Sequence, residues 1–219
     1  MTATLSSTFF GPVQWYQKLL HYDHVYIEQC DNYVKQTYRN RCLIATTNGV
    51  QALTVPVAPS KLSSCHAVGN TDSASFFEGR SEGALARISD HGNWRHQHWQ
   101  ALQSAYGDSP FFEFYEDDLH PFFTDRWEYL YDYNEAIRQK MCELLDIQPS
   151  VALTTAYRQQ PENDFRESIH PKTPLPDADF QLRRYYQVYE QKHGFLPNLS
   201  ILDLLFNMGP ESIFYLITQ

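Results

Sequence analysis

A hairpin signal in the first quarter of the chain most limits what this sequence can fold into. Asn48-Gly49 separates two runs that are rich in apolar and β-branched residues, 41–47 and 50–57. Asparagine and glycine readily adopt the positive φ angles of a type I′ turn, which joins two antiparallel strands. Pro56 ends the second run, because proline cannot donate a hydrogen bond to a strand ladder. The sequence therefore predicts an antiparallel β-hairpin over these two runs.

The first thirty residues have the pattern of a β-α-β unit. Residues 5–10 predict a strand, which Gly11-Pro12 interrupts, and residues 24–29 predict a second strand. Between them, residues 13–22 place apolar side chains at helical spacing. A helix that connects two strands in this way usually joins parallel strands through a right-handed crossover. This unit and the hairpin together predict an α/β fold.

The rest of the chain supplies further elements around this sheet. Asn93 is the predicted N-cap of a helix over 94–106, and Gly107 is its predicted stop. Residues 60–83 are rich in serine, glycine and asparagine, which predicts a long flexible loop. The other predicted elements are a helix over 125–145, a strand over 151–156, an irregular segment over 158–179, a helix over 200–207 that Ser200 caps, and a last helix after Gly209-Pro210. We expect one α/β domain over residues 1–219, with a short mixed sheet that includes the hairpin and with flanking helices.

Composition argues against several classes of function. With a formal net charge of −9, the chain lacks the broad basic face that binding to nucleic acid or to anionic lipid requires. No apolar run approaches the roughly 20 residues that span a bilayer, and the N-terminus has no signal-peptide pattern. The four cysteines form no C-x-x-C pair, so the sequence predicts no metal site. We expect a cytoplasmic protein with reduced cysteines.

A local cluster of cations nevertheless stands out in this acidic chain. Residues two apart in an extended segment point to the same face, so Lys35, Arg39 and Arg41 could converge there. Clustered fork-shaped donors suit a carboxylate or a phosphate, which predicts a clamp for a small anionic ligand. The alternative is that these cations pair with nearby acids such as Glu28 and Asp31.

A second candidate site lies in the segment 88–99, which holds three histidines, two tryptophans, an arginine and an aspartate at a strand-to-helix junction. The free N–H groups at a helix N-terminus attract anions. His91 or His96 could act there as a general base that Asp90 orients. His98 falls on the apolar face of the helix and is predicted to be a core histidine. The alternative for the whole segment is capping and packing.

A third segment, 195–207, is apolar except for a few isolated polar residues. Asn198 and Asp203 could reach a ligand, and the alternative is capping or buried hydrogen bonding. The chain contains no P-loop, dinucleotide-binding, zinc-protease or nucleophile-elbow motif. The enzyme classes that those motifs mark are therefore less favoured.

In this order, these segments resemble the WbqC-like protein family over nearly the whole chain. The stretches that carry the resemblance are 9–16, 33–41, 54–57, 89–96 and 193–207. The resemblance implies a bacterial cytoplasmic protein. It also implies an association with surface-polysaccharide (O-antigen) gene clusters, and hence work on nucleotide-activated or amino sugars. No catalytic residues come with the resemblance.

These observations lead to two hypotheses about function. The first is a transferase of surface-polysaccharide or amino-sugar biosynthesis that moves an acyl or aminoacyl group on an activated sugar, with an anionic or sugar-linked substrate. The second is a non-catalytic binding or assembly protein of the same pathway, whose partner is a pathway enzyme or a second copy of the chain; the aromatic run at 111–123 favours it. The sequence names no cofactor. The predicted catalytic residues are Asp90, His91 and His96, and the predicted substrate-binding residues are Lys35, Arg39, Asn40, Arg41, Trp94 and Asn198.

Overall fold

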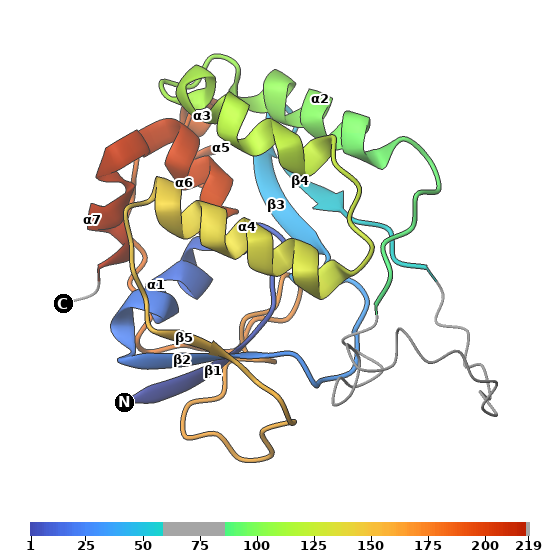
Figure 1. Ribbon diagram of the computed structural model, residues 1–219. Coiled ribbons are helices and arrows are strands. Elements are labelled where there is room, and N and C mark those ends of the chain that lie inside the picture. The colour runs from blue at the N-terminus through green and yellow to red at the C-terminus, as the bar shows by residue number, and fades with distance from the viewer. Residues whose placement is uncertain (59–85, 218–219) are drawn as a thin grey trace.

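The computed structural model describes residues 1–58 and 86–217 and shows a mixed α/β fold (Figure 1). It contains a short parallel sheet, an antiparallel hairpin and flanking helices, so the predicted fold class is confirmed. The segment 60–83, for which the sequence predicts a flexible loop, lies outside the described residues.

The parallel sheet has the strand order β1-β2-β5. Its strands are β1 (Thr2–Ser6), β2 (His24–Glu28) and β5 (Val151–Leu153), and helix α1 (Val13–His21) connects the first two. The predicted β-α-β unit is therefore confirmed, although β1 lies earlier than predicted and β5 is shorter. Strand β1 ends at Ser6, and the chain beyond it does not stay extended, since Phe10 has a φ of 41° that no strand residue adopts. The rings of Phe9 and Phe10 are fully buried in an aromatic cluster.

The predicted hairpin is confirmed and forms a two-stranded sheet of its own. Strands β3 (Arg41–Thr46) and β4 (Gly49–Thr54) pair antiparallel, and Thr46 lies opposite Gly49. Gly49 has a φ of 100°, which glycine adopts without the penalty that a side chain would bring. Asn48 does not have the positive φ of a type I′ turn, so the hairpin forms without the turn type that the sequence predicts. The hairpin buries Cys42, Ile44 and Leu53 against the helices.

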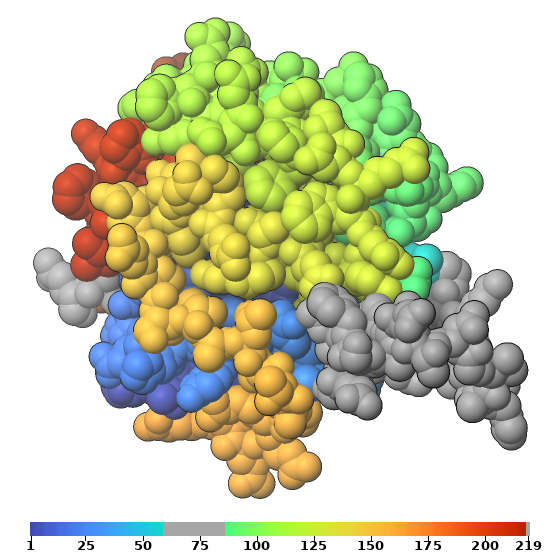
Figure 2. All heavy atoms as spheres, viewed as in Figure 1, coloured from blue at the N-terminus to red at the C-terminus, as the bar shows by residue number. Residues whose placement is uncertain are grey.

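A layer of helices lies beside the hairpin, and α2 (Trp94–Tyr106) packs against β3. The other helices of this layer are α3 (Phe112–Leu119), the 3₁₀ helix η3 (His120–Phe123) and α4 (Leu130–Leu144). Figure 2 shows α4 and the chain before it over the upper part of the molecule in that view. The bounds of α2 match the prediction, but the side chain of Asn93 caps nothing and Gly107 has a right-handed φ of −54°.

Two features of this helical layer differ from the prediction. Helix α3 and the 3₁₀ helix fill the aromatic stretch to which the sequence assigned no element. Helix α4 begins at Leu130 rather than at residue 125, because the chain just before it pairs with another segment. There, the backbone N–H of Ile88 donates to the Glu128 carbonyl at 2.9 Å, and the N–H of Leu130 donates to Ala86 at 2.8 Å. This pairing keeps the chain extended up to Tyr129, and the helix begins at Leu130, whose N–H would have no partner within the helix.

The C-terminal elements are α5 (Glu190–His193), α6 (Ile201–Met208), the 3₁₀ helix η4 (Gly209–Ser212) and α7 (Ile213–Leu216). The predicted cap of α6 is confirmed, since the Ser200 hydroxyl accepts a hydrogen bond from the backbone N–H of Leu202 at 3.3 Å. The same hydroxyl donates to the carbonyl of Phe10 at 2.8 Å. Residues 158–179 contain neither helix nor strand, as the sequence predicts.

We expect Ser200→Ala to lower the free energy of unfolding by about 1–2 kcal/mol, because it removes both an N-cap and a buried hydrogen bond. Urea denaturation followed by tryptophan fluorescence measures the loss. Ser104→Ala, at an exposed position of α2, is the matched control and should change the free energy by less than about 0.5 kcal/mol. Equal effects of the two changes would show that the Ser200 hydroxyl does not stabilise the fold.

Candidate functional site

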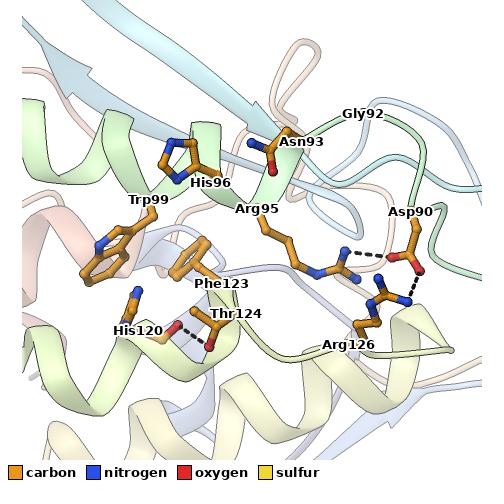
Figure 3. A pocket seen from close by; sticks show the side chains of 10 residues that line it. All are labelled: Asp90, Gly92, Asn93, Arg95, His96, Trp99, His120, Phe123, Thr124 and Arg126. Carbon is orange, nitrogen blue, oxygen red and sulfur yellow. Dashed lines mark hydrogen bonds and ion pairs between the residues drawn. The ribbon is translucent and has the colours of Figure 1, made fainter.

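A hollow of about 320 Å³ lies between the start of α2 and the segment that follows α3 (Figure 3). Helix α2 contributes Arg95, His96 and Trp99, and the loop before it contributes Asp90. The side chains that bring charge, imidazole or aromatic surface to it are Asp90, Arg95, His96, Trp99, His120 and Arg126, with Phe123 beside Trp99. Sites for small molecules range from about 300 to 1,000 Å³, so this hollow suits a ligand of about one ring.

One end of the hollow is aromatic. The ring of Trp99 lies 4.7 Å from that of His120 and 5.5 Å from that of Phe123, measured between centroids. Phe123 in turn stacks on the buried ring of Phe10 at 5.7 Å, with an angle of 6° between the planes. This contact ties η3 to the core, so the aromatic end has a fixed shape.

The other end of the hollow is charged (Figure 3). The carboxylate of Asp90 accepts a hydrogen bond from Nη1 of Arg95 at 2.7 Å, and Nη1 of Arg126 lies 3.9 Å from its second oxygen. The hydrogen bond from Arg95 holds the pKa of Asp90 below its usual value. The guanidinium of Arg95 also lies over the ring of Trp94, at 4.4 Å.

The electrostatics of this hollow differ from those of the whole chain. Two guanidinium groups face a single carboxylate, and the exposed imidazoles of His96 and His120 line the same hollow. The chain as a whole carries a formal charge of −9. A local excess of positive charge beside an aromatic surface can hold an anionic group at one end and a ring at the other.

The structure brings two of the three predicted catalytic residues together. Asp90 and His96 line the hollow, whereas His91 is exposed and does not line it. The carboxylate of Asp90 pairs with Arg95 and Arg126, and not with an imidazole. Trp94 lies behind Arg95 and donates its indole N–H to the carbonyl of Ser89 at 3.0 Å. His98 is a core residue, as predicted, and burial lowers its pKa to about 4.

The predicted clamp at residues 35–41 rested on an extended segment that does not form. Residues 35–40 form turns, and Gln36 has a φ of 62°. Lys35 is exposed, whereas the side chain of Arg39 points into the protein and is only 3% exposed. The Nε of Arg41 donates to the hydroxyl of Thr54 across the hairpin at 3.1 Å. The expected common face of Lys35 and Arg39 is therefore absent.

Arg39 belongs to a buried network. Its guanidinium pairs with the carboxylate of Asp31, through Nε at 3.1 Å and through a shorter contact from Nη2. The second oxygen of Asp31 accepts a hydrogen bond from the hydroxyl of Tyr131. Burial alone lowers the pKa of Arg39, but the charge of Asp31 opposes this effect and the net shift is upward. This is the acid pairing that the sequence left as the alternative.

The two predicted asparagines complete hydrogen bonds within the fold. Asn40 is buried, and its side chain donates to the carbonyl of Val55 at 2.9 Å. Asn198 accepts from the backbone N–H of Gln14 at 2.9 Å and donates to the Gln14 side chain at 3.0 Å. Gln14 lies in the first turn of α1, so Asn198 caps that helix from a distant part of the chain.

Sequence reasoning missed several side chains of the hollow, among them Arg95, Trp99, His120 and Arg126. Arg95 and Trp99 stand in the histidine-rich segment, where four-residue helical spacing was a usable signal that they share a face. His120 and Arg126 lie more than twenty residues further along and reach the hollow only through the packing of η3 against α2. Nothing local in their sequence marks them.

The described residues contain neither a candidate metal site nor a helix that could span a membrane. Within 1–58 and 86–217, no group of three or more histidine, cysteine, aspartate or glutamate side chains could hold a metal ion. No helix in the same residues is long and apolar enough to cross a membrane.

Comparison with known proteins places the chain in a family. A family model described as "WbqC-like protein family" matches residues 7–73, 82–170 and 177–215. The chain is also 24% identical over 234 residues to "Uncharacterized protein Rv1507c" of Mycobacterium tuberculosis, a match that covers 95% of this chain and 91% of that protein. No solved structure matches. Because the family model covers most of its length, this chain belongs to the WbqC-like protein family.

Proposed function

We propose that this protein is a transferase of bacterial surface-polysaccharide or amino-sugar biosynthesis, and that the hollow beside α2 binds its sugar substrate. The observation that carries the proposal is the pairing of a cationic end and an aromatic end within one hollow of single-ring size. An activated sugar has matching chemistry, because it joins an anionic group to a ring with an apolar face. The association with surface-polysaccharide gene clusters that the family resemblance implies also supports this proposal.

Four of the lining residues have a role in this proposal. Arg95 and Arg126 hold the anionic group of the substrate, and Trp99 lies under its ring. His96 is exposed at the rim and takes the proton from the sugar hydroxyl or amine as that group attacks an activated acyl ester or thioester. The alcohol or thiol that leaves takes the same proton back from His96, so the enzyme returns to its starting state.

The rival proposal, a non-catalytic binding protein, has one favourable observation. Phe114 on α3 is 73% exposed. The rest of the aromatic run that suggested a docking surface is core, since Phe112, Tyr115, Phe122 and Phe123 are buried. The hollow therefore gives the enzyme the stronger support.

We expect Arg126→Ala to weaken the binding of a UDP-linked amino sugar by about tenfold or more, because a charge-assisted hydrogen bond to the substrate is lost. Isothermal calorimetry measures the change. Arg126 has an 84% exposed side chain, so the fold should be unaffected. Arg184→Ala removes an exposed, ion-paired arginine outside the hollow and is the matched control. Equal affinities for both variants would refute this placement of the substrate.

His96→Ala separates the enzyme from the binding protein. In a transferase it should leave affinity nearly unchanged and lower the rate of acyl transfer by about 10²–10⁴-fold, the usual contribution of a general base. His91→Ala, at a neighbouring exposed position that does not line the hollow, is the control. Sugar binding with no transfer in the wild-type protein would instead favour the rival.

A further inference from the structure

Asp90 supplies the carboxylate at the charged end of the hollow. Its contacts differ from those expected of a general base or of a residue that orients one. It contacts two arginines, and its side chain is 53% exposed. Exposed ion pairs contribute little stability. Asp90 can therefore leave Arg95 at small cost.

The hydrogen bonding of Arg95 is incomplete. Only Nη1 donates to Asp90, while Nε and Nη2 are buried and have no hydrogen-bond partner in the described part of the chain. Buried donors without an acceptor are unfavourable. The carboxylate of Asp90 therefore satisfies only part of the hydrogen-bonding capacity of Arg95.

Arg126 is only loosely engaged with Asp90. The two side chains approach to 3.9 Å, which is beyond hydrogen-bond distance, and the side chain of Arg126 is 84% exposed. It lies beside Arg95 on the same side of the hollow (Figure 3). A larger anion between the two guanidinium groups could engage both at hydrogen-bond distance.

We infer that the carboxylate of Asp90 occupies the position of a ligand phosphate when no ligand is bound. The ligand then binds by exchanging its phosphate for this carboxylate. A ligand carboxylate would carry a single negative charge, as Asp90 does, and would leave one of the two guanidinium groups unbalanced. A phosphate brings three acceptor oxygens and a charge of about −1.5 to −2, which balances two guanidinium groups. The ligand class is a phosphate joined to a single ring. That this ligand is the sugar substrate rests on the proposed function. The exchange itself requires only that the ligand carry a phosphate.

The test is Asp90→Asn, which keeps the size of the side chain and removes its charge. We expect inorganic phosphate, titrated by calorimetry at low salt, to bind about tenfold more tightly to this variant than to the wild type. Asp117→Asn, the same change at an exposed position of α3 outside the hollow, should leave the affinity unchanged. Melting temperatures of both variants verify that they are folded.

Two further ligands separate the sources of the phosphate. A hexose 1-phosphate and a UDP-linked hexose both carry a phosphate on a sugar, and the tighter binding to Asp90→Asn should appear with each. The gain should be larger for the hexose 1-phosphate, because its monoester phosphate carries a charge of about −1.5 to −2 and each phosphate of the UDP-linked hexose carries only one.

Failure of the inference and failure of the proposed function look different. If sugars bind and Arg126→Ala weakens them, but Asp90→Asn binds phosphate no more tightly than the wild type, the exchange is refuted and the function stands. If Asp90→Asn gains affinity for inorganic phosphate and no sugar binds, the exchange stands and the sugar substrate is wrong. No phosphate binding to either protein overturns the exchange.

Discussion

Arg39→Ala is expected to lower the free energy of unfolding by about 3–5 kcal/mol, the usual cost of removing one partner from a buried ion pair. Arg39 is 3% exposed, and its loss would leave the carboxylate of Asp31 buried beside Tyr131 without a counter-ion. Urea denaturation measures the effect. The result decides between the two alternatives that the sequence left open, because a ligand clamp on the surface would lose affinity and little stability.

Arg41→Ala is the matched control for this experiment. It removes an arginine two residues away, half-buried, whose Nε donates one hydrogen bond to Thr54. Its cost should stay below about 1.5 kcal/mol. A double-mutant cycle with Asp31→Asn then isolates the Arg39–Asp31 interaction. A loss of stability for Arg39→Ala no larger than that for Arg41→Ala would contradict the buried pair.

Asp203→Ala is expected to cost about 3–5 kcal/mol, because three buried donors lose their acceptor at once. Asp203 is fully buried in α6, and its carboxylate accepts hydrogen bonds from Tyr106 at 2.8 Å, Tyr185 at 2.7 Å and Gln187 at 2.9 Å. The Tyr106 hydroxyl also accepts from the backbone N–H of Ala45 in β3 at 3.1 Å. One side chain thus joins α6, α2, the hairpin and the segment before α5.

Asp203 also makes the stability of the fold depend on pH, and the direction of its pKa shift determines the direction of that dependence. Burial raises the pKa of Asp203 above 3.8, and the three hydrogen bonds offset this only in part. The folded state therefore binds this proton more tightly than the unfolded state. Its contribution to stability is full below 3.8 and is lost as the pH rises through the raised folded-state pKa.

Asp203→Asn tests this sign, since the amide keeps one acceptor oxygen and does not titrate. The free energy of unfolding of the wild type, relative to that of Asp203→Asn, should fall as the pH is raised from about 4 to about 8. Equilibrium urea denaturation at each pH measures the difference. A difference that rises with pH would mean that the carboxylate is stabilised in its charged form, and the assignment would be wrong.

These two networks explain why isolated polar residues in the sequence were ambiguous. Arg39 and Asp203 carry the same side chains that a substrate site needs. Both side chains are buried and pair with residues from other segments of the chain, so they stabilise the fold. The hollow has the opposite character, because Arg126 and the two imidazoles at its rim are exposed and can exchange partners with a ligand.

Local chemistry determined several features from the sequence alone. The turn at Asn48-Gly49 sets the hairpin, and the hydroxyl of Ser200 sets the start of α6. The bounds of α2 follow from its own helical pattern. Each of these depends on residues that are neighbours along the chain, so a window of a few residues contains the physical cause.

Tertiary structure alone decided the start of α4 and the site. Helix α4 begins late because residues 128–130 pair with 86–88. Arg126 and His120 line the same hollow as Arg95 only because Phe123 packs on Phe10 and Trp99. Arg39 pairs with Asp31 because the segment between them turns rather than extends. Such contacts depend on burial and on packing between segments distant in sequence, and no local pattern of residue types encodes them.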